Sequence, residues 1–309
     1  MALLFYSQFD DPEDWGKHLR DAVPGLDFRV WPDVGEPRDI EAALVWKAPE
    51  GELRKLPNLR LIINLGAGVD SIVKDRTLPA GIPIVRIADD EMSRMMAQFV
   101  LAAVLRHYRD FVSFARAQKE KRWHYIHPHE AATRSVGVMG LGNLGGMAAA
   151  ELVRQGFRVA GWARTPKKLE GVECFHGPGG FAPFLARSQI LVAMLPLTPE
   201  TEGILDARAF SLLPQGAKFV NVGRGQVVDE DALVEALRSG HVAEATLDVF
   251  RTEPLPAGSP LWDMDQVLIT PHLASVAIPR TAARQVAENL RRVAAGEPLL
   301  NVVDPRRGY

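Results

Sequence analysis

The sequence contains very little cysteine. A single cysteine, Cys174, stands in a chain of 309 residues, so no disulfide can form within the chain. This scarcity is typical of proteins that work in a reducing compartment. We expect Cys174 to be a small structural residue and not a nucleophile.

Long apolar runs are also lacking. The longest, residues 97–105, is interrupted by Gln98 and is far shorter than the roughly 20 residues that a membrane-spanning helix needs. Residues 1–6 are apolar, but no basic segment precedes them and acidic residues follow at 10–14, which predicts a first strand and not a signal peptide. We therefore expect a soluble, cytoplasmic protein.

The chain has little net charge. Its formal charge of −2 gives no electrostatic reason to expect nucleic acid or an anionic membrane as a partner, so local cations would have to bind a small anionic substrate. His124, His127 and His129 stand close together in the sequence. Without a helical His-x-x-x-His pair and without cysteines they predict a solvated linker, and we expect no metal.

Short apolar segments alternate with amphipathic or turn-rich segments along the first third of the chain. This alternation is typical of an α/β layer with a parallel sheet. The predicted strands are residues 3–6, 28–31, 43–46, 59–65 and 82–87. In residues 89–121, apolar residues recur at helical spacing and predict one long helix. A last helix, over about residues 278–295, is expected to return to the first domain.

A later set of apolar segments predicts a second sheet. Its strands are residues 136–139, 158–162, 190–193, 218–222, 243–249 and 267–269, the six that a doubly wound dinucleotide-binding domain requires. We place the domain boundary in the long helix. Residues 1–98 with 276–309 then form one domain, and residues 99–275 form the other.

The first two strands of the second sheet are joined by glycines with the spacing Gly-x-Gly-x-x-Gly. The first glycine permits a tight turn, the second lets the backbone approach a pyrophosphate, and the third lets the helix pack on the strand. The helix N-terminus then offers free N–H groups to the diphosphate. The predicted dinucleotide-binding turn comprises Gly140, Leu141, Gly142, Asn143, Leu144 and Gly145.

The second strand of this unit ends without an acidic residue. In an NAD site this position normally carries Asp or Glu, which binds the ribose 2′-hydroxyl group. Here Arg164 and Thr165 follow the strand, and a guanidinium can pair with a 2′-phosphate that a carboxylate would repel. The sequence therefore predicts NADP in preference to NAD. The alternative is that Arg164 is a solvated loop residue.

Two glycines, Gly66 and Gly68, follow the fourth predicted strand of the first sheet. Glycines at the carboxyl end of a strand, just before a helix, expose backbone donors that suit a small carboxylate. The same pattern is equally typical of a tight connection between a strand and a helix. Both interpretations stay open from the sequence.

Three polar side chains follow three successive strands of the second sheet: Arg224, Glu253 and His272. Because ligands of such sheets lie outside the carboxyl ends of the strands, we expect the three to meet in one cleft. Arg224 can bind a carboxylate and polarise a ketone oxygen. His272, kept protonated by Glu253, can deliver a proton while a nicotinamide delivers hydride. Each residue alone has a structural explanation, but together they predict the reduction of a 2-keto acid.

These motifs resemble those of the D-2-hydroxyacid dehydrogenases, and within that family the bacterial glyoxylate/hydroxypyruvate reductases of the A type. The resemblance runs along the whole chain. It rests on residues 44–46, 65–71, 135–146, 162–165, 195–201, 221–225, 247–250, 253–256, 270–272 and 307–309.

The resemblance implies a fold and a role for individual residues. The fold is α/β, with a flavodoxin-like substrate domain, a Rossmann NADP-binding domain and an active-site cleft between them. The implied activity is NADPH-dependent reduction of glyoxylate and hydroxypyruvate, with His272 as the proton donor beside Arg224 and Glu253, in homodimers built through the dinucleotide domain. The implied substrate residues are Trp46, Ala67, Gly68 and Arg224, and the further cofactor residues are Pro196, Val222, Gly223 and Asp248.

Two residues leave alternatives within this family. Lys47 follows Trp46 where related reductases have histidine, and a lysine that faces the pocket would add positive charge and change the range of keto acids. Trp123 stands where some relatives send an aromatic residue toward the partner's site, although packing at the dimer surface is the simpler interpretation.

Other functions remain open on the same scaffold. One is an NADP(H)-binding sensor without catalysis, since transcriptional corepressors share this fold, but the intact trio favours turnover. Another is a reductase for bulkier 2-keto acids. Oxidation of formate or phosphite is disfavoured, because related formate enzymes have glutamine where Glu253 stands.

Overall fold

The structure is a computed structural model in which residues 1–304 are described. The chain divides into two compact units. Unit 1 is formed by Met1–Met92 and the segment that begins at Val276, and unit 2 is Ser93–Ser275. The chain leaves unit 1 in the first turn of helix α3 (Asp90–Tyr108). The boundary predicted from the sequence lies in the same helix, after residue 98.

Unit 1 is built around a five-stranded parallel sheet with the strand order β2-β1-β3-β4-β5. This is the order of the flavodoxin-like doubly wound fold. The strands are β1 (Ala2–Tyr6), β2 (Asp27–Val30), β3 (Ile40–Val45), β4 (Leu61–Asn64) and β5 (Ile84–Arg86). The helices are α1 (Pro12–Ala22), α2 (Asp70–Val73), α9 (Pro279–Ala295) and the 3-10 turns η1 (Pro37–Asp39) and η2 (Leu53–Lys55).

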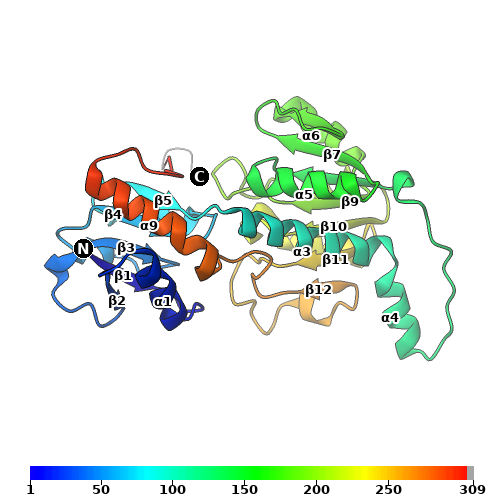
Figure 1. The fold of residues 1–309 in the computed structure, drawn as a ribbon. Helices are drawn as coiled ribbons and strands as arrows, with labels where there is room; N and C mark the ends of the chain where they lie inside the picture. The colour runs from blue at the N-terminus through cyan, green and yellow to red at the C-terminus, as the bar shows by residue number, and fades with distance from the viewer. Residues whose placement is uncertain (305–309) are drawn as a thin grey trace. The chain divides into compact units, whose positions relative to one another are not determined.

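The two faces of this sheet bury separate apolar cores, because successive side chains of a strand point to opposite faces. On one face, Leu3 and Phe5 of β1 pack with Trp15 of α1 and with α9. On the other face, Leu4 and Tyr6 pack with the segment that contains η2 and α2. Figure 1 shows α1 and α9 side by side on their face of the sheet.

Unit 2 contains a seven-stranded parallel sheet with the order β12-β11-β10-β9-β6-β7-β8. Six neighbouring strands, from β8 to β11, follow the Rossmann order 3-2-1-4-5-6, and β12 extends the sheet. The strands are β6 (Ser135–Met139), β7 (Arg158–Ala163), β8 (Val172–His176), β9 (Ile190–Ala193), β10 (Ala217–Asn221), β11 (Val242–Leu247) and β12 (Val267–Ile269). The predicted pair of doubly wound parallel-sheet domains is confirmed.

Helices cover both faces of the second sheet. Residues of α3 and α5 share one apolar core, and residues of α6, α7 and α8 share the other. The elements are α4 (Phe111–Lys119), α5 (Asn143–Arg154), α6 (Gly177–Ala186), α7 (Ala207–Ser211), α8 (Glu230–Arg238) and the 3-10 turns η3 (Ala131–Thr133), η4 (Gly225–Val227) and η5 (Pro260–Asp263).

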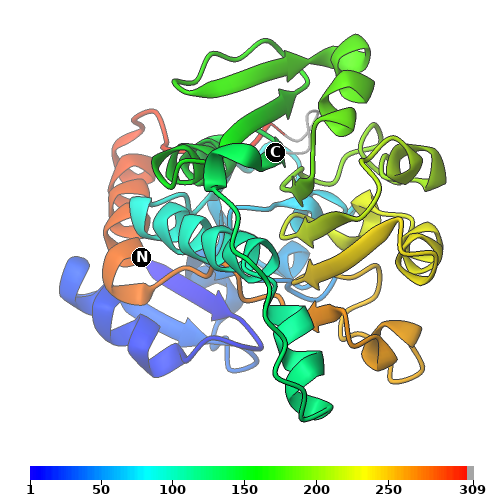
Figure 2. The same ribbon diagram turned by 90° about the vertical axis from the view of Figure 1, so that its right-hand side faces the viewer.

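The prediction of one long helix over residues 89–121 is wrong. Helix α3 ends at Tyr108 and α4 begins at Phe111, as Figure 2 shows. Between them Asp110 has a φ of 59°, a left-handed conformation that a right-handed helix does not contain. The apolar spacing continues through both helices, and no glycine or proline marks the break. Periodicity alone therefore could not reveal it.

The sequence also predicted six strands in unit 2, and β8 is the seventh. This strand lies at the edge of the sheet, where β7 is its one partner among residues 1–304, and it carries exposed residues such as Glu173 and His176. A short edge strand with polar side chains lacks the continuous apolar run that marks a buried strand.

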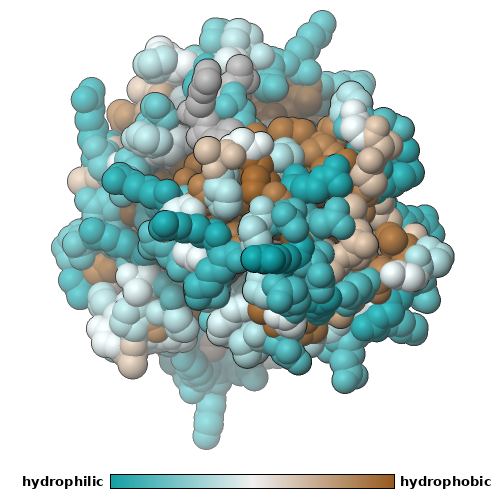
Figure 3. Space-filling view, turned by 90° about the vertical axis from the view of Figure 1, so that its left-hand side faces the viewer, coloured by the Kyte–Doolittle hydropathy of each residue, from teal (hydrophilic) through white to brown (hydrophobic). Residues whose placement is uncertain are grey.

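The surface is rich in polar side chains. Hydrophilic residues cover most of the face in Figure 3, with hydrophobic atoms in smaller areas between them. Among the helices within residues 1–304, none is long and apolar enough to cross a membrane.

Candidate active site

The glycine-rich turn connects β6 to α5 in unit 2. Gly140 has a φ of 116°, which only glycine adopts readily. A Cβ on Gly145 would lie 1.8 Å from the carbonyl oxygen of Gly140, so only glycine lets α5 begin this close to the strand. Apart from Gly142 itself and the residues next to it in the chain, no described atom lies within 4 Å of a Cβ built on Gly142, the N-cap of α5. The turn thus leaves room in front of a helix N-terminus, as a pyrophosphate requires.

Arg164 lies directly after β7 and is exposed. No carboxylate stands among residues 162–165. A hydrogen bond from Thr198 lowers the pKa of the Glu200 carboxyl, and the positive charge of Arg164 contributes to the same shift. Arg164 therefore acts electrostatically on the loop that follows β9.

Two loops at the carboxyl end of the sheet, after β9 and β10, lie against each other. The Thr201 hydroxyl donates to the carbonyl of Pro196 over 2.7 Å and accepts from the amide of Thr198 over 2.8 Å, which holds the first loop. A Cβ on Gly223 would lie 2.8 Å from the carbonyl oxygen of Leu195. Pro196 and Gly223, two of the predicted cofactor residues, are thereby brought to one region of unit 2.

The three predicted catalytic residues follow three strands that are neighbours in the sheet. Arg224 comes after β10, Glu253 after β11 and His272 after β12. The close approach of these loops depends on Gly225, because a Cβ there would lie 1.8 Å from the carbonyl carbon of Phe250. The three strand ends therefore lie next to one another, whereas the cleft in which the three side chains are expected to meet stays a prediction.

His272 and Glu253 form a direct contact. The Nδ1 atom of His272 lies 2.8 Å from Oε2 of Glu253, and both side chains are partly exposed. The other carboxylate oxygen of Glu253 accepts a hydrogen bond from the amide of Phe250 over 3.1 Å. The carboxylate is thus fixed by the backbone on one side and orients the imidazole on the other. The predicted contact is confirmed, whereas the catalytic roles stay predictions.

The backbone of His272 is held in an unusual conformation, with a φ of 55°. Its amide donates to the carbonyl of Asp248 over 2.8 Å. The carboxylate of Asp248, which is buried, accepts hydrogen bonds from the hydroxyl of Thr270 and from the amides of Leu273 and Ala274. Asp248, predicted as a cofactor residue, therefore anchors the loop that carries His272.

Arg224 is the N-cap of the 3-10 turn η4, and Asn221 at the end of β10 holds the loop before it. Asn221 is buried; its amide group donates to the carbonyl of Arg224 over 3.2 Å, and its Oδ1 accepts from the amide of Gly223 over 3.2 Å. The Arg224 guanidinium donates to the carbonyl of Gly223 over 2.8 Å. The strand end thus fixes the backbone from which the predicted substrate-binding guanidinium extends.

In unit 1, the predicted carboxylate loop follows β4. Gly66, Ala67 and Gly68 are partly exposed, while the flanking Leu65 and Val69 are buried. This is the arrangement expected of a loop that contacts a small ligand through its backbone.

Trp46 packs onto this loop. A Cβ on Gly66 would lie 2.5 Å from Cζ3 of Trp46, so the indole requires glycine there. Lys47, the next residue, has a φ of 50°, and its Nζ lies 5.8 Å from the centroid of the Trp46 ring. The structure thus groups the predicted substrate residues of unit 1 and places the positive charge of Lys47 beside them.

A buried pair of one histidine and one glutamate, His107 and Glu244, joins α3 to the second sheet. His107 Nδ1 lies 2.8 Å from Oε2 of Glu244, and its Nε2 lies 3.0 Å from the hydroxyl of Thr246. Burial lowers the pKa of His107. Burial alone would raise the pKa of Glu244, but hydrogen bonds and charges from His107 and Lys218 outweigh it and hold that pKa below its usual value. No motif or spacing in the sequence singles out this pair, because its members are 137 residues apart.

Within the described part of the chain, no group of three or more His, Cys, Asp or Glu side chains is arranged to hold a metal ion. His124, His127 and His129 are exposed. The motif at residues 307–309 lies outside the described residues.

A Rossmann unit with an open glycine turn, and a Glu–His pair at the ends of its strands, defines a two-domain, dinucleotide-dependent dehydrogenase. Residues 101–274 match the family model of the D-isomer specific 2-hydroxyacid dehydrogenase NAD-binding domain. The chain belongs to this family.

Relatives match along the full length. The glyoxylate/hydroxypyruvate reductase A of Serratia proteamaculans is 39% identical over 314 aligned residues, and the alignment covers 100% of this chain and 100% of that protein. A D-isomer specific 2-hydroxyacid dehydrogenase from Xanthobacter autotrophicus, solved with NADPH and MES, is 61% identical with a TM-score of 0.96, covering 100% of this chain and 99% of that one. The NADPH-dependent glyoxylate/hydroxypyruvate reductase of Sinorhizobium meliloti, solved with NADP and sulfate, is 35% identical with a TM-score of 0.94 and the same coverage.

Proposed function

We propose that this protein reduces small 2-keto acids, glyoxylate and hydroxypyruvate, to D-2-hydroxy acids with NADPH. The observation that carries the proposal is the contact between His272 and Glu253 at the ends of neighbouring strands, in a chain of this family. The relatives from Serratia and Sinorhizobium are named for the same activity.

The reaction needs a hydride at the ketone carbon and a proton at the ketone oxygen. NADPH supplies the hydride when bound. His272 supplies the proton from Nε2, since Nδ1 faces Glu253. The Arg224 guanidinium binds the substrate carboxylate and stabilises the negative charge that develops on the ketone oxygen. Glu253 orients the imidazole and stabilises its protonated form.

The cofactor is assigned to unit 2. The turn from Gly140 to Gly145 holds the diphosphate at the N-terminus of α5, and Arg164 with Thr165 binds the 2′-phosphate. Pro196 and Val222 border the nicotinamide end. Unit 1 supplies the amides of Ala67 and Gly68 for the substrate carboxylate, and Trp46 limits the size of the substrate.

A steady-state substrate panel tests the proposal. Initial rates are measured with NADPH and with NADH on glyoxylate, hydroxypyruvate and bulkier 2-keto acids, and the product is assigned with a D-specific enzyme. We expect the two small acids and NADPH to give the highest kcat/KM. Tight binding of NADPH without oxidation by any substrate would show a sensor, and a preference for branched or aromatic keto acids would show a reductase for larger substrates.

We propose that the protein acts as a homodimer formed through unit 2. Large apolar side chains on α4 and in the segment after it are exposed: Phe111 is 59%, Tyr125 76% and Trp123 98% exposed. A second copy of the same chain would bury them. Sedimentation equilibrium should give twice the chain mass of 34.0 kDa, and Trp123→Ser with Tyr125→Ser should shift the protein toward monomer. A monomer at micromolar concentration would contradict the proposal.

We also assign the protein to the cytoplasm, where the single Cys174 stays reduced. In cell fractionation, NADPH-dependent glyoxylate reduction should follow the cytoplasmic marker enzyme.

A further inference from the structure

We propose that Asn64 is a positioning residue for substrate binding, because it holds the backbone of residues 66–69 in the conformation that presents their amides to the substrate carboxylate. The inference rests on the proposed function and adds to it a residue that contacts the loop and not the substrate.

The carbonyl groups of the loop are held by side-chain donors. Asn64, at the end of β4, is 1% exposed, and its Nδ2 donates to the carbonyl of Gly66 over 2.7 Å and to that of Gly68 over 2.9 Å. The guanidinium of Arg86, at the end of the neighbouring strand β5, donates to the carbonyl of Ala67 over 3.1 Å. Three consecutive carbonyls are therefore fixed.

Fixing a carbonyl also fixes the amide that follows it. In a trans peptide the C=O of one residue and the N–H of the next point in opposite directions. The amides of Ala67, Gly68 and Val69 therefore point away from the side chains that hold the preceding carbonyls. Within the described residues, no backbone N–H of residues 66–69 donates to a protein acceptor. These amides are available to an anion, and amide hydrogen bonds to a carboxylate are charge-assisted.

Burying the side chain of Asn64 costs folding free energy, and apolar packing does not explain why an asparagine stands there. Its Oδ1 is buried and has no hydrogen-bond partner among the described residues. A buried acceptor without a partner destabilises the folded state, and an apolar side chain would avoid this cost. The three residues before it in β4, Leu61 to Ile63, are all apolar. The two donor bonds to the loop are what the side chain contributes at this position.

Trp46 packs against the other side of the loop and restricts its movement. Because the indole lies against Gly66, the loop cannot rearrange freely if its carbonyls lose their donors. We expect loss of Asn64 to leave the loop in place but to broaden the directions of its amides, so that substrate binding weakens more than folding does.

The test is Asn64→Ala, measured as KM and kcat for glyoxylate and as the dissociation constants of oxalate and NADPH. Oxalate is a carboxylate probe that the enzyme cannot reduce, and its binding is measured calorimetrically with NADP⁺ present. We expect the KM and the oxalate dissociation constant to rise about tenfold or more, with kcat and NADPH affinity changed by less than about threefold, the pattern of lost substrate binding.

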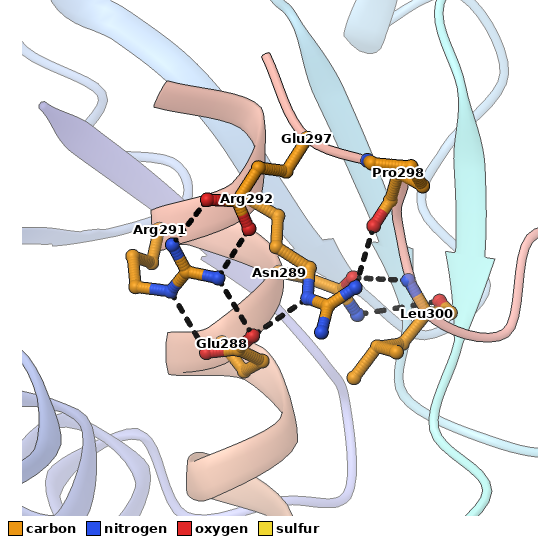
Figure 4. Close-up of polar contacts among 7 residues, drawn as sticks. All are labelled: Glu288, Asn289, Arg291, Arg292, Glu297, Pro298 and Leu300. Atoms are coloured by element: carbon orange, nitrogen blue, oxygen red, sulfur yellow. Dashed lines mark hydrogen bonds and ion pairs between the residues drawn. The ribbon is translucent and has the colours of Figure 1, made fainter. Parts of the chain in front are cut away.

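Asn289 offers a matched control in the same unit. It is fully buried on α9, and its Oδ1 accepts from the amide of Leu300 over 2.8 Å, while its Nδ2 donates to the carbonyl of the same residue over 3.4 Å (Figure 4). Asn289→Ala thus removes another buried asparagine that ties down a loop backbone. We expect it to lower the melting temperature without changing the KM for glyoxylate or the binding of oxalate.

The outcomes separate the inference from the proposed function. An unchanged oxalate dissociation constant in Asn64→Ala overturns the inference, and so does an equal rise in Asn289→Ala, which would show general loosening of unit 1. If Asn64→Ala does not fold, Asn64→Leu keeps a side chain of similar size but offers no donor to the loop, and an unchanged oxalate affinity there overturns the inference too. Failure of the unaltered protein to reduce any 2-keto acid overturns the proposed function, while its oxalate affinity still reports on the loop.

Discussion

The backbone amide of Ala274 donates to the buried carboxylate of Asp248 over 2.9 Å, across 26 residues of sequence. The hydroxyl of Thr270 and the amide of Leu273 bind the same carboxylate, so the residues on both sides of His272 share one anchor. His272 itself has a left-handed backbone, which costs a non-glycine residue roughly 1–2 kcal/mol. The three hydrogen bonds to one anion stabilise this loop.

We expect Asp248→Asn to loosen the loop of His272. The substitution places an amide donor against backbone donors, and the loss of charge-assisted bonds should cost about 1–3 kcal/mol of unfolding free energy. The kcat should fall, because the imidazole is less well oriented. Urea unfolding and steady-state rates measure the two effects.

Asp206→Asn is the matched control for that variant. Asp206 is the exposed N-cap of α7 and accepts from the amide of Ala209 over 2.7 Å, and asparagine is an equally good N-cap. Both stability and kcat should stay near those of the unaltered protein. An Asp248→Asn variant that behaves like this control would remove the anchoring role.

His272→Gln and Glu253→Gln test the proton donor and its partner. Because general acid catalysis contributes roughly 10²–10⁴-fold to rates, His272→Gln should lower kcat by at least about 100-fold, and Glu253→Gln should lower it less. NADPH binding, followed by nicotinamide fluorescence, should be retained in both. His241→Gln changes a histidine that contacts Gln215 and Phe210 at the amino end of β11, opposite the carboxyl ends that carry the predicted catalytic residues, and should leave kcat unaltered. Full turnover in His272→Gln would assign the proton to another group.

Arg164→Asp tests the choice of cofactor. The guanidinium pairs with a 2′-phosphate and a carboxylate repels it, so the ratio of kcat/KM for NADPH over NADH should fall by about 100-fold or more, since charge-assisted bonds contribute about 1.5–3 kcal/mol and repulsion adds to their loss. Arg158→Asp, at the start of the same strand β7, makes the same charge change at its opposite end and should leave the ratio unaltered. Equal ratios in the two variants would refute the assignment of the 2′-phosphate to Arg164.

The His107–Glu244 pair predicts acid-dependent stability. Burial lowers the pKa of His107, so the unfolded chain binds a proton more readily than the folded one, and unfolding free energy falls as pH drops through about 6.5. The pKa of Glu244 is also lowered, and its contribution is lost further down, below about 4.5. The protonation of both groups therefore lowers the free energy of unfolding in acid relative to its value at neutral pH.

His107→Gln keeps hydrogen-bonding capacity toward Glu244 and Thr246 but cannot take up a proton. The melting temperature of the unaltered protein should fall between pH 7.5 and 5.5 by more than that of the variant. His241→Gln, at a partly exposed histidine just before β11, is the control and should reproduce the pH profile of the unaltered protein. Parallel profiles for His107→Gln and the unaltered protein would show that His107 does not titrate on unfolding.

Much of the site could be predicted because its signals are local. The turn from Gly140 to Gly145 lies between a strand and a helix that are adjacent in sequence, and the missing acid before Arg164 stands within the same βαβ unit. The positions of Glu253 and His272 followed from a general rule of parallel sheets, that strand ends on one edge lie together. The prediction of one long helix over residues 89–121 was wrong because the amphipathic periodicity continues across the break at Asp110.

By itself, the sequence determined the alternation of strands and helices, the dinucleotide-binding turn and the identity of the groups at the strand ends, since each depends on residues a few positions apart. Only the tertiary structure decided which polar side chains hold those groups in place. Asn64 and Arg86 meet on one loop, and Asp248 reaches Ala274, because parallel strands bring distant segments together. A buried polar residue must find its partners wherever the chain folds back, and no periodicity in the sequence records where that is.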